Sequence, residues 1–334
     1  MDNKNFSFYV TDFFSNFLPN HKGCSKNTIY SYRDSFSLFL IFCSEYKHIN
    51  IDTLSFNNIN VSLILDYVSW LEKERKASVS TRNQRLAAIK SFCKYVQLQA
   101  PEFYDICASI RKIEMEKGVH QAVNYLSVEA TKILMQQPNI KEKQELRDLA
   151  ILSLMYDSAA RVGEIINLKV SNVLINGQNI VQLLGKGNKI RLTPITREVT
   201  NILNIYINIF NLQKDELLFF NKSHKKLTKE GISYILNKYI SKAQKNHNDL
   251  FNKKITPHCL RHSKAMHMVE NNVNLIYIRD FLGHVSVVTT EYYAKANPEI
   301  RRKQIESASE NIIEKSKYSV EERNNLKAFL KELL

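Results

Sequence analysis

Glycine and proline are scarce in this 334-residue chain, which holds 8 of the first and 6 of the second. Because these residues are the strongest helix breakers, their scarcity favours a mainly helical protein and argues against collagen-like, low-complexity and all-β repeat architectures. The 5 cysteines are an odd number without a CxxC spacing, which disfavours a disulfide framework and a structural zinc cluster. No signal pattern appears, and no apolar run approaches the ~20 residues that cross a bilayer, so we expect a soluble, cytoplasmic protein.

Positive charge is what the chain has in excess, with 47 Lys plus Arg against 33 Asp plus Glu and a formal net charge of +14. Such an excess indicates a polyanionic partner, nucleic acid first and an anionic membrane second. Residues 119–297 carry 24 basic and 14 acidic side chains, whereas residues 1–118 carry 15 and 12, and residues 298–334 carry 8 and 7. We therefore expect phosphate to be handled by the middle segment.

The N-terminal segment predicts four or five helices. Ser25 is a helix N-cap ahead of an apolar stripe, 61–71 is a second helix that contains the only tryptophan, and 80–97 is a third. Cations at the start of this third helix, or beside its apolar stripe, are candidate contacts to a DNA backbone. A solvated helix face is the plainer alternative. These cations are Arg82, Arg85, Lys90 and Lys94.

The middle segment contains the main β signal. The dipeptide Asn176-Gly177 separates 173–175 from 180–184, and the turn 185–188 leads into 190–192. This pattern predicts a three-stranded antiparallel sheet inside a helical domain. The flanking helices are expected at 127–136, 146–156, 260–270 and 275–282.

Four short motifs concentrate cationic and nucleophilic side chains. Each is weak by itself, but their order and spacing together are specific. They are Ala160–Ile165 (ARVGEI), Gly185–Arg191 (GKGNKIR), His258–His262 (HCLRH), and Leu282–His284 (LGH) followed nine residues after its histidine by Tyr293.

With these motifs the chain resembles the tyrosine recombinases, the phage-integrase and Xer family. The match runs from Arg161 to Tyr293, and Ser80-Thr81 with Arg85-Leu86 resembles the family's core-binding domain. The resemblance implies a mainly α fold with a small antiparallel β-sheet, in which a helical core-binding (SAM-like) domain and a catalytic domain form a C-shaped DNA clamp. The implied division is core-binding domain 1–112, linker 113–120, catalytic domain 121–297 and helical C-terminal tail 298–334.

Cleaving a phosphodiester requires a nucleophile, positive charge at the phosphoryl oxygens and an acid for the leaving oxygen. No carboxylate cluster of a two-metal nuclease stands out, so we expect no metal or other cofactor. By resemblance, Arg161 and Arg261 bind the non-bridging oxygens, and Lys186 protonates the departing 5′-oxygen. A structural pairing of Arg161 with Glu164 is the alternative for that arginine. The alternatives to Lys186 are Lys189 and Arg191, which are otherwise candidate DNA contacts.

The histidines and the tyrosine complete the set that the resemblance implies. His258 assists proton removal from the nucleophile and hydrogen-bonds the phosphate, and His284 donates a hydrogen bond to the phosphate. His262 is outside this set, and we interpret it as a structural hydrogen-bonder rather than a catalyst. Tyr293 is the nucleophile, because the nine-residue step from His284 matches the family only there; Tyr292 is its competitor. Reading the three histidines as metal ligands is opposed by the adjacent arginine and by the lack of an HExxH motif.

The sequence thus predicts a site-specific recombinase that exchanges DNA strands through a 3′-phosphotyrosine bond and a Holliday junction, to integrate or excise a mobile element. Chromosome or plasmid dimer resolution and DNA inversion are alternatives, and a type IB topoisomerase-like activity and a non-catalytic DNA-binding protein are rivals. The expected partners are double-stranded DNA with inverted-repeat core sites and three further copies in a tetramer, joined by tails that dock in trans. Accessory DNA-bending or directionality factors are compatible with this prediction, and a membrane is not expected.

Overall fold

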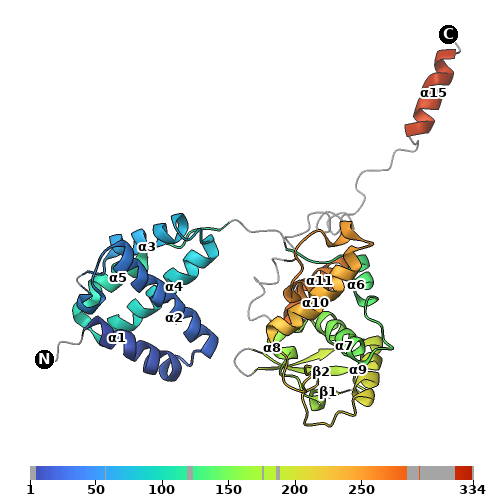
Figure 1. Ribbon diagram of the computed structural model, residues 1–334. Helices are drawn as coiled ribbons and strands as arrows, with labels where there is room; N and C mark the ends of the chain where they lie inside the picture. Colours follow the sequence, from blue (N-terminus) through green and yellow to red (C-terminus); the bar gives the residue numbers. More distant parts are fainter. Residues whose placement is uncertain are drawn as a thin grey trace. The chain divides into compact units, whose positions relative to one another are not determined.

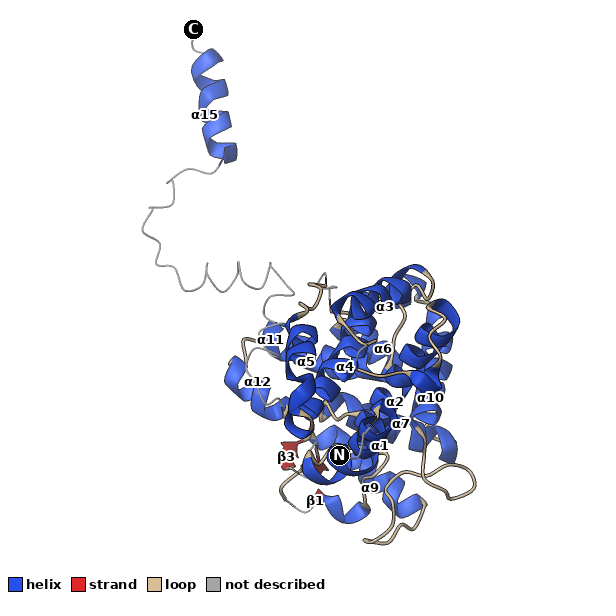
Figure 2. Cartoon of the chain, turned by 90° about the vertical axis from the view of Figure 1, so that its left-hand side faces the viewer, coloured by secondary structure: helices blue, strands red, loops and turns tan. Residues whose placement is uncertain are grey.

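The computed structural model describes residues 5–56, 58–118, 123–174, 177–185, 189–283, 293 and 320–332. The chain divides into two compact units, Met1–Gln121 and Ala122–Leu334. Helices make up most of both units, and the strands belong to one small sheet in the second unit (Figures 1 and 2). The expected fold class, mainly α with a small antiparallel sheet, is confirmed.

The first unit is built of helices and short helical turns. Ser25 caps α2 by accepting the Thr28 N–H at 3.3 Å, as the sequence predicts. The helix expected from residue 80 begins earlier, because the Ser78 side chain accepts the Thr81 N–H and so caps α4. The elements are α1 (Phe6–Asp12), the π-helical η1 (Phe13–His21), α2 (Lys26–Ile41), η2 (Phe42–Tyr46), η3 (Ile51–Thr53), α3 (Val61–Lys73), α4 (Val79–Gln99), η4 (Pro101–Phe103) and α5 (Tyr104–Lys112).

Aromatic rings dominate the core of this unit. The ring of Phe92 on α4 meets those of Phe13 and Phe36 edge-on, with centroids 5.3 Å and 5.2 Å away. Such edge-to-face pairs add to the hydrophobic gain of burying the rings. The stripe predicted on α4 is buried in the same core, which fixes the orientation of that helix. Its members are Leu86, Ile89, Cys93 and Val96.

The second unit surrounds its sheet with helices. The helix predicted from residue 260 begins at Pro257 instead, because Thr256 caps it and proline is well tolerated in a first turn. His258 therefore lies inside the helix. The elements are α6 (Val128–Met135), α7 (Lys143–Asp157), α8 (Val162–Ile165), η5 (Val170–Asn172), β1 (Val173–Leu174), β2 (Ile180–Leu184), β3 (Ile190–Pro194), α9 (Arg197–Ile209), α10 (Lys229–Gln244), η7 (Asn248–Phe251), α11 (Pro257–Glu270), α12 (Leu275–Leu282) and α15 (Val320–Glu332).

The sheet has the order β1-β2-β3 with antiparallel pairing throughout. Gly177 has a φ of +87°, a conformation that favours glycine and suits the predicted hairpin turn. Residues 175, 176 and 186–188 lie outside the described residues. Val181 and Leu183 are buried, while Leu184 and Ile190 face outward, so the strands alternate as a half-buried sheet should.

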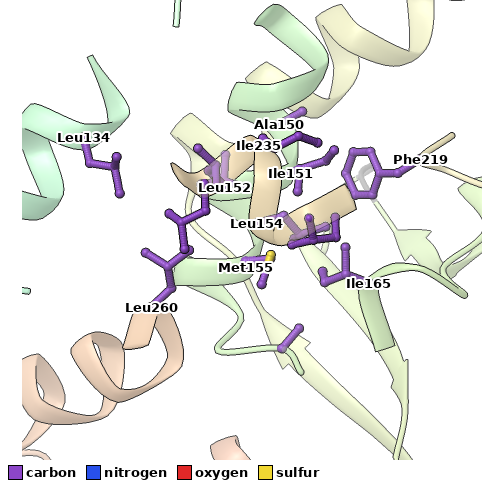
Figure 3. Close-up of a cluster of buried hydrophobic side chains, with 14 of the residues drawn as sticks. Leu134, Ala150, Ile151, Leu152, Leu154, Met155, Ile165, Phe219, Ile235 and Leu260 are labelled. Carbon is purple, nitrogen blue, oxygen red and sulfur yellow. The ribbon is translucent and has the colours of Figure 1, made fainter. Parts of the chain in front are cut away.

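Helix α7 forms the centre of the second unit, and its core is mainly aliphatic. Leu152, Leu154 and Met155 are buried there, in one hydrophobic cluster with Ile165 of α8 and Leu260 of α11 (Figure 3). This packing fixes the C-terminal end of α7 and the first turns of α8 and α11 in one region. The motifs around Arg161 and Arg261 are on those segments, so the core positions the site.

Candidate active site

Among the cations of the site that the structure describes, Arg261 is the most deeply buried, with 1% of the residue exposed. Its guanidinium donates to the carbonyl oxygen of Ala159 at 2.7 Å and to that of Leu282 at 2.6 Å. Burial, together with the charges of Arg161 and Arg191, lowers the pKa of Arg261 to about 10, so it stays protonated at neutral pH. The carbonyls orient the guanidinium but do not cancel its charge, which leaves a fixed cation for an anionic ligand.

The carboxylate of Glu164 is shared by two arginines. Oε1 accepts from Arg161 at 3.0 Å, and the two oxygens accept from Arg191 at 2.7 Å and 3.0 Å. Oε2 also accepts the backbone N–H of Arg161 at 2.7 Å. Burial alone would raise the pKa of Glu164, but the hydrogen bonds and charges of these arginines lower it. Glu164 is therefore an anion that cancels only one of the two positive charges beside it.

The two arginines on Glu164 differ in exposure. The side chain of Arg161 is 40% exposed, whereas that of Arg191 is 12% exposed. Arg191 also lies against Gly283, because a Cβ added to that glycine would be 3.1 Å from Cδ of Arg191. Arg161 thus keeps a face open to a ligand, while Arg191 is held within the protein. The alternative reading of Arg161 as a partner of Glu164 is correct as far as the contact goes.

Tyr293 is 3% exposed, and its hydroxyl lies 2.8 Å from Nδ1 of His262. The rings of His258 and His262, one helical turn apart on α11, have centroids 4.2 Å apart. Burial, His258 and Arg261 lower the pKa of His262 to about 4. The pKa of His258 is also lowered, by partial desolvation and by the charges of Arg261 and Arg161. Both imidazoles are therefore neutral at pH 7.

Helix α11 is tied to the segment that opens the second unit. Ser263 Oγ accepts the Leu126 N–H at 2.8 Å, and Nε2 of His267 lies 2.9 Å from the Leu126 carbonyl oxygen. On the same helix, Lys264 forms a 2.8 Å ion pair with Asp157 at the end of α7. These contacts hold the Leu126 segment and the C-terminal end of α7, just before Arg161, against the helix that carries Arg261.

The predicted site residues differ in whether they belong to the described part of the chain. Lys186, His284 and Tyr292 lie outside the described residues, as do residues 298–319 of the tail. Lys189 is described and exposed, and its backbone carbonyl accepts the Gly185 N–H at 2.8 Å across the turn. Among the described residues, no group of three or more His, Cys, Asp or Glu side chains could hold a metal ion.

The cations predicted on α4 are mostly used inside the first unit. Arg82 is 4% exposed and pairs with Glu72 at 2.8 Å and with Glu116. Arg85 donates to Ser31 and Ser35 of α2, and Lys90 donates to the carbonyl oxygen of Ile113. These contacts engage the three side chains inside the first unit, and their contact with a DNA backbone stays a prediction. Lys94 alone of the four is exposed.

Sequence reasoning missed three features of the site. It treated Glu164 as a local partner of Arg161 and not as the anion that also holds Arg191. It gave His262 a structural role without a partner, and it did not single out Asp157. The pairing with Arg161 follows from a three-residue step in one helical turn. The other contacts join residues 27 to 107 positions apart, for which one sequence gives no signal.

Comparison with known families decides what kind of protein carries this site. The model of the phage integrase family matches residues 124–299, which is more than half of the chain, and the model of the phage integrase N-terminal SAM-like domain matches residues 11–99.

The chain belongs to the phage integrase family of tyrosine recombinases. It is similar to tyrosine recombinase XerD of Halalkalibacterium halodurans, with 30% identity over 285 residues that cover 84% of this chain and 90% of that protein. Tyrosine recombinase XerC of Herpetosiphon aurantiacus is 31% identical over 83% of this chain and 87% of that protein. A protein of Sinorhizobium fredii with the name integrase/recombinase y4rC is 29% identical over 97% of both chains. The chain is thus a site-specific tyrosine recombinase.

Solved structures of this family share the fold. XerH recombinase bound to its palindromic difH substrate superposes with a TM-score of 0.68 over 86% of this chain and 81% of that chain, at 19% identity. The Tn1549 transposon integrase in complex with transposon right end DNA gives 0.68 over 89% and 98%, at 15% identity. At these identities the likeness concerns the fold. In the described part of this recombinase, no helix is long and apolar enough to span a bilayer.

Proposed function

We propose that this recombinase cleaves double-stranded DNA by attack of Tyr293 on the scissile phosphate, which leaves a 3′-phosphotyrosine bond and a free 5′-hydroxyl. The 5′-hydroxyl of a partner strand then displaces the tyrosine. The phosphodiester energy is kept in the covalent bond, so strand joining requires neither ATP nor a metal. The observation that carries the proposal is the buried guanidinium of Arg261, which is oriented by two carbonyl oxygens and keeps its charge.

The site suits a phosphate that gains charge in the transition state. Arg261 and the open face of Arg161 offer two guanidinium groups to the non-bridging oxygens, and Glu164 holds Arg161 in place. By family resemblance, Lys186 protonates the 5′-oxygen, while His258 and His284 hydrogen-bond the phosphate. A phenol with a pKa of ~10 attacks poorly as such, so the tyrosine proton must pass to a nearby base, for which the resemblance names His258.

The domain roles follow the same resemblance. We assign core-binding to residues 1–112, a linker to 113–120, catalysis to 121–297 and protomer docking to 298–334. Support comes from solved relatives that are complexes with DNA substrates. On α15, Leu326, Phe329 and Leu330 are 50–57% exposed, which suits a tail that docks in trans on a neighbouring copy in a tetramer.

The biological role that we propose is integration or excision of a mobile element through a Holliday junction. Coverage of 97% of the integrase/recombinase y4rC supports this choice. Dimer resolution is the second candidate, because XerC and XerD relatives are 30–31% identical. A plasmid with two target sites in direct orientation, or with one site on each of two plasmids, separates excision from integration by its products. Relaxation without recombinant products would instead indicate a topoisomerase-like activity.

The direct test is covalent trapping. A target sequence is first selected from random duplexes with Tyr293→Phe protein and is then built into a nicked suicide duplex. We expect the wild-type protein to form an SDS-resistant adduct in the presence of EDTA, and Tyr293→Phe to form none. Tyr292→Phe is the matched control and should react like the wild type. An adduct that survives in Tyr293→Phe, or one that EDTA abolishes, refutes the proposal.

A further inference from the structure

The hydroxyl of Tyr293 has a histidine partner within hydrogen-bond distance, and that partner is His262. Nδ1 of His262 lies 2.8 Å from the hydroxyl oxygen, and the two rings are tilted by 56° with centroids 5.6 Å apart. His258 is exposed, and in the described part of the chain its side chain makes no hydrogen bond. Its ring packs against that of His262. The two histidines of α11 therefore stand in different positions relative to the nucleophile.

We propose that His262 accepts the proton of Tyr293 when the tyrosine attacks, and that His258 contacts the phosphate instead. The inference rests on the proposed function. In the step, the O–H bond of Tyr293 breaks and its proton passes to Nδ1, while the oxygen forms the bond to phosphorus. The bond from phosphorus to the 5′-oxygen breaks, and that oxygen takes a proton from Lys186. In strand joining, the attacking 5′-hydroxyl gives its proton to Lys186 and its oxygen bonds to phosphorus. The bond from phosphorus to the tyrosine oxygen breaks, and His262 returns its proton to that oxygen.

The surroundings of His262 keep it ready to accept a proton. Within the described ranges, the charged or titratable groups that act on it are His258 and Arg261 on its own helix and Tyr293 opposite. Together with burial, the first two keep the imidazole neutral at pH 7, so Nδ1 has a free lone pair when Nε2 carries the hydrogen. A DNA phosphate bound by Arg261 and Arg161 brings negative charge that opposes this lowering. DNA binding should therefore make His262 a stronger base at the moment when one is needed.

If His262 is the base, the cleavage defect of its alanine variant should depend on pH; if it is only a structural partner of Tyr293, the defect should not. Single-turnover cleavage of the selected suicide duplex separates these two roles. At pH 7, we expect His262→Ala to cleave about 100-fold more slowly than the wild type, a typical contribution of general base catalysis. The deficit should shrink about tenfold per pH unit as the pH rises toward the phenol pKa of ~10, because the tyrosine then ionises without help. His258→Ala, the matched control on the same helix, should show a deficit that does not change with pH.

Two further measurements keep the test valid if alanine disturbs the fold. His262→Gly should regain activity with added imidazole, whereas His258→Gly should not. A duplex with a 5′-bridging sulfur, which leaves without a proton, should rescue Lys186→Ala but leave the defect of His262→Ala in place. The inference is overturned if His262→Ala cleaves as fast as the wild type or shows a deficit that does not depend on pH. It is also overturned if this variant cleaves faster, because His262 would then hold Tyr293 in an inactive position. If the wild-type protein itself forms no adduct through Tyr293, the proposed function fails instead.

Discussion

Both units bury arginines, and the partners of Arg82 and Arg261 separate a cation that carboxylates neutralise from one that they do not. Arg82 in the first unit is 4% exposed and lies between the carboxylates of Glu72 and Glu116. Arg261 in the second unit is 1% exposed and is held by carbonyl oxygens. In the first case the charge is cancelled, and in the second it persists. Burying an uncancelled charge is costly, so its presence indicates a site that awaits an anion.

The cores differ in a related way. The first unit packs aromatic rings around α4, and its cations on that helix are used to fasten neighbouring helices. The second unit packs mainly aliphatic side chains around α7 and buries Arg261 of α11 against the carbonyl oxygen of Ala159, which follows α7. A basic helix is therefore weak evidence for contact with DNA. A buried arginine bonded only to neutral acceptors is stronger evidence for a site that binds an anion.

The largest expected effect comes from making the same substitution in both arginines. Arg261→Lys should reduce the rate of adduct formation on the suicide duplex by about 100-fold or more, because an ammonium cannot satisfy two carbonyls and a phosphate in a planar fork. Arg82→Lys should leave the rate per folded molecule unchanged and lower the unfolding midpoint of the first unit. Equal losses of rate in the two variants would remove the distinction between the arginines.

A smaller effect is expected from acid. Burial would raise the pKa of Glu145, but the Asn139 N–H and the ammonium groups of Lys238 and Lys242 lower it to about 2. The stability from this carboxylate is thus present above pH ~4.5 and is lost as the pH falls toward 2. Discounted for solvent screening, it amounts to about 1–2 kcal/mol. Glu145→Gln should therefore lower the free energy of unfolding at pH 7. Between pH 5 and 2.5, this variant should lose less stability than the wild type.

The fluorescence of Trp70 can show which unit loses stability in Glu145→Gln. The only tryptophan, Trp70, lies in the first unit, so its fluorescence follows that unit in urea, while far-UV circular dichroism follows both. Glu145→Gln should shift the dichroism transition and leave the fluorescence transition unchanged. A shift in the fluorescence transition would show that the two units do not unfold independently.

The smallest effect concerns the backbone that presents its carbonyl to Arg261. Ala159 has a φ of +47°, which costs an alanine about 1 kcal/mol and glycine little. Ala159→Gly should therefore raise the free energy of unfolding by about 0.5–1 kcal/mol. Ala160→Gly is the control, because Ala160 does not have a positive φ, and it should be neutral or destabilising in urea titrations. Destabilisation by Ala159→Gly would mean that the methyl group contributes more to packing than the strain removes.

Local signals in the sequence predicted much of the fold. The bounds of β2 and α12 match the expected 180–184 and 275–282, because turn residues and caps mark their ends. Helix starts were missed where the capping residue stood earlier than the apolar pattern, as with Ser78 and Thr256. Apolar periodicity shows which face of a helix is buried, but a neighbouring side chain fixes where the helix begins.

The sequence motifs name the members of the candidate site, but they give less of its geometry. Motif order placed Arg161 and Arg261 in one site, and the core around α7 does bring their segments together. The contact of His262 with Tyr293 and the pairing of Arg82 with Glu116 depend on how distant segments pack. A single sequence carries no periodic or local signal for such contacts, so the residue types were evident before their partners were.

The two hydrogen bonds on Leu126 bear on how this enzyme could be re-engineered. Ser263 and His267 hold both polar groups of that residue's backbone, and both belong to the helix of His258 and Arg261. A chimera that joins a different N-terminal module to the second unit should therefore place its junction before Val123. A fusion point inside 123–126 would break the hydrogen bonds between Leu126 and α11. Replacement of the N-terminal module at that point would therefore also reduce activity.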